Sequence, residues 1–271
     1  MLVANPFVYE KTMLADIKSA TIPFMLEEHY GQCGEDLIVF SILRSLRTQN
    51  LLSDWTNFCC IEIGANHAFA GSNSYLLWKY TGVPCILVEA NPKLLPDLHK
   101  ARPDVQLVHT AIVTDDAEHV EFFVSHHHEL SSLNRDFVEK WHDGNVGVEE
   151  VINVPAMRIN RFLEQYVPEN RQIVLLSVDI EGMDLEIIED MDFEKWRPII
   201  VQMEPSNHFH ADESVKMTVA MQKRGYVLLS ETNVNLIFIE QAVFSRFLLP
   251  LSGNVAQETQ KPLSESDEAV G

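Results

Sequence analysis

The chain has few basic residues and no long apolar run. It has 20 lysines and arginines against 40 aspartates and glutamates, which gives a formal net charge of −20. A surface this acidic argues against a nucleic-acid backbone or an anionic membrane as the main partner. No apolar stretch is long enough to cross a bilayer, and the N-terminus has no basic region followed by an apolar core. We therefore predict a cytoplasmic protein that binds neither membrane nor nucleic acid.

Cysteine is also scarce. The four cysteines, Cys33, Cys59, Cys60 and Cys85, form no CxxC pair. The last three of them lie in expected core strands. This usage predicts buried free thiols in a reducing compartment.

The usual glycine signatures of phosphate binding are missing. The chain has neither the GxGxxG dinucleotide fingerprint nor the GxxxxGK[ST] loop. It has instead the stretch FCCIEIGANHAFAG, from Phe58 to Gly71. A short apolar run, typical of a strand buried on both faces, is followed by a turn at Gly64–Asn66 and a helix-like segment from Asn73 to Tyr80. Strand, glycine turn and helix form the opening of a nucleotide-binding crossover.

The acid in this stretch limits the ligand. Glu62 lies two residues before Gly64, where it would repel a pyrophosphate and suit a cationic ligand without phosphate. S-adenosylmethionine, which combines adenosine, a sulfonium and an amino-acid tail, has these properties. About 25 residues on, an apolar strand ends in Glu89, at the usual spacing of an acid that accepts hydrogen bonds from ribose hydroxyls. A purely structural turn remains the alternative interpretation.

Strands alternate with helices along the chain, which predicts an α/β fold with a doubly wound, mostly parallel sheet. Residues 226–230 and 235–239 are expected to close it as an antiparallel hairpin. We expect a helical or extended preamble at 1–50, one domain at 51–250 with a loop insertion near 126–153, and a disordered tail at 251–271. Four expected strands end in acids, which should gather at one edge of the sheet: Glu62, Glu89, Asp179 and Glu204.

Three groups of motifs together resemble the FkbM-type methyltransferases. They are HYGQCGEDL from His29, IEIGAN from Ile61 with VEANP from Val88, and LSVDIEGMD from Leu176. The resemblance runs from about His29 to Ile239. It implies the Rossmann-like fold of class I S-adenosylmethionine-dependent methyltransferases, with a seven-stranded sheet and an antiparallel C-terminal hairpin. It also implies O-methylation of a hydroxyl on a small acceptor, a sugar or a secondary metabolite.

The resemblance also implies a set of ligand contacts. Glu62, Gly64 and Asn66 would surround the methionine tail of S-adenosylmethionine, and Glu89 would bind the ribose. Ala111 and Ile112 would meet the adenine. Asp179 and Glu181 would face the sulfonium and the acceptor. The family more often has aspartate at the position of Glu62.

Methyl transfer to an alcohol needs alignment of oxygen, methyl and sulfur, and a base for the hydroxyl proton. We expect one of Asp179, Glu181 or His208 to be this base. A divalent metal is an alternative that the sequence does not favour: Asp179, Glu181 and Glu204 could bind Mg²⁺, and the histidines of 126–128 a softer ion.

Other functions remain open on these residues. A non-catalytic protein that binds an adenosyl ligand on the same fold is the main alternative, and a Rossmann-type oxidoreductase is disfavoured by the missing fingerprint. Asp179 could also simply cap the helix after Gly182. The sequence carries no signal for an oligomeric state.

Overall fold

The computed structural model describes residues 28–141, 146–205 and 213–247. The strands are β1 (Phe58–Ile63), β2 (Cys85–Glu89), β3 (Gln106–His109), β4 (Ala111–Val113), β5 (His119–Ser125), β6 (Val148–Arg158), β7 (Gln172–Val178), β8 (Ile200–Met203), β9 (Tyr226–Glu231) and β10 (Leu236–Glu240). The α-helices are α2 (Glu35–Thr48), α3 (Tyr75–Thr81), α4 (Leu95–Ala101), α5 (Arg135–Lys140), α6 (Ile159–Tyr166), α7 (Asp184–Asp190) and α8 (Glu213–Lys223). Two short 3₁₀ turns are η1 (Trp55–Asn57) and η2 (His128–Leu130). No helix in these ranges is both long and apolar enough to span a membrane.

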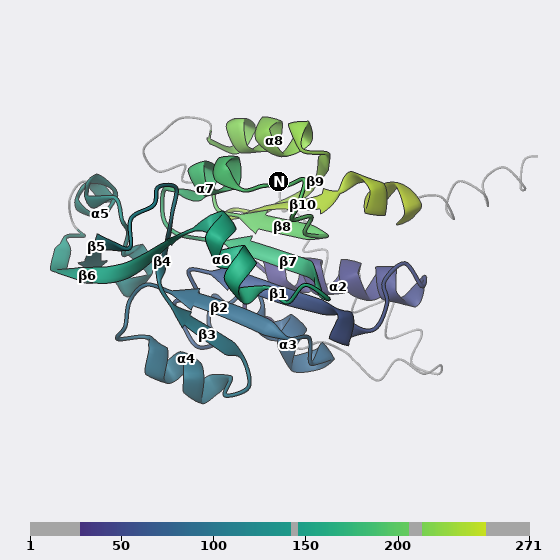
Figure 1. The fold of residues 1–271 in the computed structure, drawn as a ribbon, viewed down its shortest axis with the longest axis horizontal. Helices are drawn as coiled ribbons and strands as arrows, with labels where there is room; N and C mark the ends of the chain where they lie inside the picture. The colour runs from purple at the N-terminus through teal and green to yellow at the C-terminus, as the bar shows by residue number, and fades with distance from the viewer. Residues whose placement is uncertain (1–27, 142–145, 206–212, 248–271) are drawn as a thin grey trace, which may run out of the picture.

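Seven strands form one large sheet in the order β3-β2-β1-β7-β8-β10-β9 (Figure 1). The pairs from β3 to β8 are parallel, and β10 is antiparallel to both of its neighbours. The predicted doubly wound sheet with an antiparallel hairpin is thus confirmed. The chain moves outward from β1 to β3 and then returns to β7 on the other side of β1. The strand order therefore reverses between β1 and β7, where open α/β sheets bind ligands.

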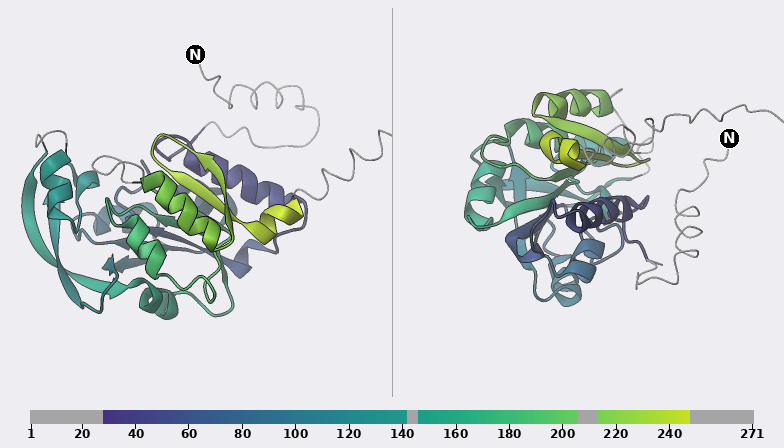
Figure 2. Two further views of the ribbon diagram at one scale, coloured as in Figure 1. Left: turned by 90° about the horizontal axis from the view of Figure 1, so that it is seen from above. Right: turned by 90° about the vertical axis from the view of Figure 1, so that its right-hand side faces the viewer.

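Alternate residues of β1 enter two different cores. Cys60 packs with α2 and α3 on one face of the sheet, while Ile61 and Ile63 pack with α6, α7 and α8 on the other. All six residues of β1 are buried, which explains its continuous apolar character. Helix α2 contributes Leu43 and Leu46 to the first of these cores (Figure 2). The second half of the expected preamble is therefore part of the same folded unit.

The expected loop insertion is more regular than the sequence indicates. Strand β6 begins at Val148, inside the loop insertion expected near 126–153, and pairs with β4 and β5 in a small separate sheet. Figure 1 shows this sheet at one end of the large one. The first half of β6 is mostly exposed, so its side chains lack the alternation that marks a half-buried strand. Before β6, the described residues from 126 onward are mostly loop, with η2 and α5 as short helical segments.

Candidate functional site

A cavity of about 390 Å³ opens at the carboxyl ends of β1, β2 and β7. This volume suits a small ligand, and the position is the one where the strand order reverses. None of the described residues that line it is a lysine or arginine. Four of them are acids: Glu89, Glu129, Asp179 and Glu181. The site therefore favours a cation and disfavours a phosphate.

Gly64 allows the loop after β1 to pass very close to the end of β7. Its φ is +82°, and a Cβ placed there would lie 1.8 Å from the backbone oxygen of Asp179. Only glycine fits both the conformation and the space. Next to it, Asn66 adopts a φ of +45° and lines the cavity.

Glu89 lies at the end of β2 with its carboxylate fixed. Its oxygens accept hydrogen bonds from the backbone N–H groups of Asn66 and Asn91, both at 2.7 Å. Burial raises the pKa of Glu89, although these N–H groups oppose the shift. Each carboxylate oxygen has a second lone pair, so Glu89 can also accept from a ligand hydroxyl. The predicted Ala111 and Ile112 are buried at the cavity wall beside it.

The expected orientation of Glu62 needs correction. Glu62 is 3% exposed and is not one of the cavity-lining residues. Its carboxylate accepts hydrogen bonds from Ser72, Ser74 and the backbone N–H of Asn73, at 2.5 to 3.0 Å. Arg102, fully buried, lies 3.4 Å away. Glu62 thus holds the start of α3 in place and does not face the ligand.

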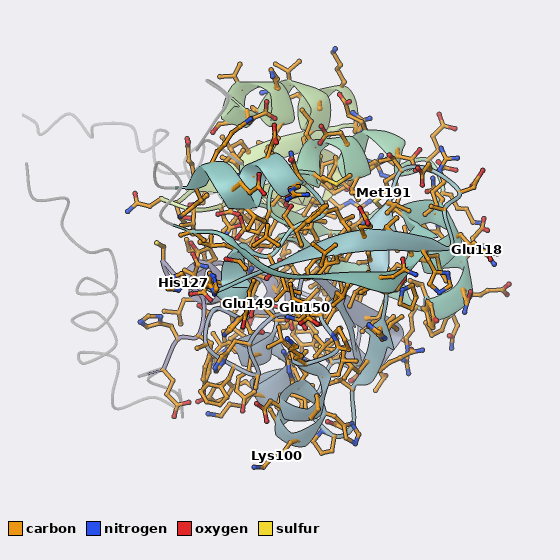
Figure 3. All side chains as sticks on the ribbon, turned by 90° about the vertical axis from the view of Figure 1, so that its left-hand side faces the viewer. Lys100, Glu118, His127, Glu149, Glu150 and Met191 are labelled. Atoms are coloured by element: carbon orange, nitrogen blue, oxygen red, sulfur yellow. The ribbon has the colours of Figure 1, made fainter. Side chains whose placement is uncertain are left out.

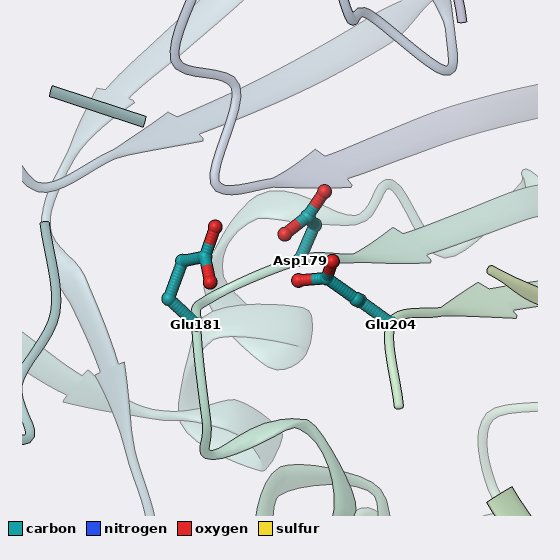
Figure 4. A group of neighbouring side chains, drawn as sticks. All are labelled: Asp179, Glu181 and Glu204. Carbon is teal, nitrogen blue, oxygen red and sulfur yellow. The ribbon is translucent and has the colours of Figure 1, made fainter. Parts of the chain in front are cut away.

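Three carboxylates lie close together, and two of them belong to residues that line the cavity (Figure 4). Oxygens of Asp179, Glu181 and Glu204 lie within 4.8 Å of one another. Burial raises the pKa of Asp179 to about 6, although a hydrogen bond from Glu204 acts in the opposite direction. Burial, and then the charges of Asp179 and Glu181, raises the pKa of Glu204 further above its ordinary value. Of this pair Glu204 therefore keeps its proton and donates it to Asp179.

Glu181 lines the cavity from a strained backbone. Its φ is +56°, a region that non-glycine residues rarely adopt, and its carbonyl oxygen accepts a hydrogen bond from Ser132 Oγ at 2.7 Å. Burial and the charge of Asp179 raise the pKa of Glu181 well above its ordinary value. Strain of this kind is concentrated at functional sites. The N-cap of α7 is Met183, so Asp179 does not cap this helix.

The cavity thus brings together most of the predicted site. Gly64, Asn66, Glu89, Ala111, Ile112, Asp179 and Glu181 all line it. His208 lies outside the described residues. The histidines of 126–128 are exposed, and the group of three metal-binding side chains found in the described ranges does not include them.

Two of the lining residues that were not predicted as contacts come from other parts of the chain. Gln32 reaches the cavity from the segment before α2, and it belongs to the HYGQCGEDL motif, which was the available signal. His128 Nδ1 lies 2.7 Å from Asn66 Oδ1. This contact connects η2 to the loop after β1, and no local pattern in the sequence indicates it.

The strand order and the cavity where that order reverses are those of a class I methyltransferase fold. A family profile of the methyltransferase FkbM domain matches residues 62–228, more than half of the chain. The chain therefore belongs to the FkbM methyltransferase family. A search of curated protein sequences found no significant match.

Three of the similar solved structures are named as methyltransferases. A precorrin-6y C5,15-methyltransferase from Geobacter metallireducens is 15% identical with a TM-score of 0.40, over 80% of this chain and 93% of that one. A putative O-methyltransferase from Klebsiella pneumoniae is 9% identical with a TM-score of 0.40, over 89% and 92%. A methyltransferase from Podospora anserina with bound SAH is 10% identical with a TM-score of 0.35, over 89% and 98%. Likeness this distant does not bear on the substrate.

Proposed function

We propose that this protein transfers a methyl group from S-adenosylmethionine to a hydroxyl of a small acceptor, a sugar or a secondary metabolite. The observation that carries the proposal is the charge of the cavity. It has four acids and no lysine or arginine among its described lining residues. S-adenosylmethionine is a cation without phosphate, and it fits this wall better than a dinucleotide or a nucleoside triphosphate does.

The residues at the cavity suit the parts of this ligand. Glu89 would accept hydrogen bonds from the ribose hydroxyls, as acids at this position do in related folds. Ala111 and Ile112 offer an apolar wall for the adenine. Gly64 and Asn66 would hold the methionine tail, and the carboxylate of Asp179 would face its positive charge.

When bound, S-adenosylmethionine supplies a methyl group already activated by the sulfonium. The protein has to align the acceptor oxygen with that methyl and remove the hydroxyl proton. We assign the proton to Glu181, because its carboxyl group lines the cavity and its raised pKa makes its anion more basic. A nearby positive charge lowers a carboxyl pKa, so the bound cation should bring Glu181 back to its ionised form.

The test is methyl transfer from labelled donor to a panel of hydroxylated acceptors. Glu181→Gln should bind S-adenosylhomocysteine normally and lose about 10²- to 10⁴-fold in turnover. Glu118→Gln is the matched control, because this exposed acid lies at the edge of the molecule (Figure 3). Turnover that survives in the Glu181 variant would remove this residue from the role. Donor binding without transfer to any acceptor would favour a non-catalytic binding protein.

A further inference from the structure

Polar side chains continue across the sheet from the acid cluster. Ser177 pairs with Gln202 in the β7–β8 register, so Asp179 and Glu204, each two residues further on, project from the same face. On the other side, Leu236 pairs with Met203 in antiparallel register. The residues just beyond that pair, Asn235 and Glu204, therefore stand opposite one another.

The amides in this group lack partners. Gln202 is 0% exposed, and neither its amide nitrogen nor its amide oxygen has a hydrogen-bond partner among the described residues. Asn235 is 3% exposed, and its Oδ1 is also unpartnered there. Buried polar atoms nearly always have a partner, so each such atom indicates a bound water, ion or ligand group. Both amides lie on the face of the sheet that carries Glu204.

The acids in this group also lack a counter-charge from the protein. In the described part of the chain, no ion pair joins Asp179, Glu181 or Glu204 to a lysine or arginine. Asp184 is buried nearby, and its pKa is raised by burial and by the charge of Asp179. Buried carboxylates need a proton, a cation or a hydrogen-bond donor as compensation.

We propose that Asp179 and Glu204, with the amide oxygen of Asn235, form a binding site for a hard divalent cation of the Mg²⁺ or Ca²⁺ class, with Glu181 at its open side. The donors are all oxygens, the ligands that these ions prefer. Opposite ligand oxygens lie about 4.1 Å apart around Mg²⁺ and about 4.8 Å around Ca²⁺, twice the usual metal–oxygen distance. Oxygens of Asp179, Glu181 and Glu204 lie within 4.8 Å of one another, close enough for one ion of either kind to contact them together.

The ion would supply the positive charge that these buried carboxylates do not receive from a lysine or arginine among the described residues. Its role rests on the proposed function: an ion here would orient the acceptor hydroxyl and lower its pKa, while Glu181 takes the proton. This deepens the sequence-based expectation, in which a metal was only the disfavoured alternative.

Calorimetric titration of the whole protein with MgCl₂ or CaCl₂ alone tests the site. We expect one bound ion per chain. Glu204→Gln and Asn235→Leu should each lower the affinity at least about tenfold. Glu118→Gln, which removes the same charge at an exposed position, should leave it unchanged. Thermal unfolding confirms that each variant is folded.

No ion uptake by the wild type, or unchanged affinity in either Glu204→Gln or Asn235→Leu, would overturn the site. A parallel titration with S-adenosylhomocysteine in the presence of a chelator separates the two proposals. If that ligand binds and the ions do not, only the metal site is wrong. If the ions bind and that ligand does not, the proposed function is wrong and the metal site stands.

Discussion

Gly64 is the residue on which the close approach of β1 and β7 depends. Alanine at this position would have to adopt a φ near +82° and would place its Cβ 1.8 Å from a backbone oxygen. We expect Gly64→Ala to lower the free energy of unfolding by roughly 3 kcal/mol or more and to weaken ligand binding. Chemical denaturation and ligand titration measure the two effects.

Gly82→Ala is the matched control. Gly82 also has a positive φ, +66°, but a Cβ there meets nothing within 4 Å. The free energy of unfolding of this variant should fall only by the cost of placing alanine in the left-handed region, about 1–2 kcal/mol. Equal losses in the two variants would show that the contact with β7 does not limit the residue at position 64.

Single residues differ in how well the sequence reveals them. Glu89 was predicted because it follows an apolar strand at a recognisable spacing from Gly64, and it lines the cavity. Glu62 lies in an equally clear motif, but its carboxylate is directed elsewhere by Arg102, 40 residues further along the chain. Asn235 is placed opposite Glu204 by the pairing of β10 with β8, which a local pattern does not reveal. Local patterns indicate which strand end carries an acid, while the partner of that acid depends on tertiary contacts.

At the scale of elements, the connection from β1 to α3 is held by one buried ion pair. Arg102 donates hydrogen bonds to Ser72 and Ser74 and pairs with Glu62. Arg102→Met would leave Glu62 charged and buried without its cation. We expect a loss of about 3–5 kcal/mol in the free energy of unfolding, measured by urea denaturation.

The double variant Glu62→Gln with Arg102→Met is the control. It removes both charges together, so it should recover a large part of the stability lost in the single variant. If the double variant is no more stable than Arg102→Met alone, the unpaired charge is not the cause of the loss.

The helices and strands agree best with the sequence-based prediction where they are buried. β1 and β7 are recognised as strands because their apolar runs are continuous. The first half of β6 was predicted as part of the loop insertion near 126–153, because it is mostly exposed and its sequence shows no regular alternation. A strand buried in a sheet needs apolar residues, and these form a recognisable pattern in the sequence. The position of an exposed strand depends instead on the strands that it pairs with.

At the scale of the whole molecule, buried acids should make stability depend on pH. Among the residues that the structure describes, folding raises the pKa of six carboxyl groups through burial: Asp36, Glu89, Asp179, Glu181, Asp184 and Glu204. Where the folded pKa is the higher one, the folded protein binds more protons than the unfolded chain. Stability is then greatest below the unfolded pKa and falls as pH rises through the folded pKa.

We therefore expect the free energy of unfolding without ligand to fall by about 1–3 kcal/mol between pH 5.5 and pH 8. Arg158 lowers the pKa of Asp190, so this group makes stability rise with pH. That contribution changes only below the ordinary aspartate pKa, at about pH 4, and therefore outside this range. Denaturant unfolding at several pH values measures the slope. Stability that rises over this range would mean that the buried acids are compensated by charges elsewhere.

The central claim is that the acidic cavity binds a phosphate-free adenosyl cation. It is tested most directly by calorimetric titration of the purified protein with S-adenosylmethionine and S-adenosylhomocysteine. We predict one site per chain for both compounds, with affinity that falls at least about tenfold in Glu89→Gln, in line with the loss of a charge-assisted hydrogen bond. No binding of either compound by the folded wild-type protein, or binding that Glu89→Gln leaves unchanged, would contradict it.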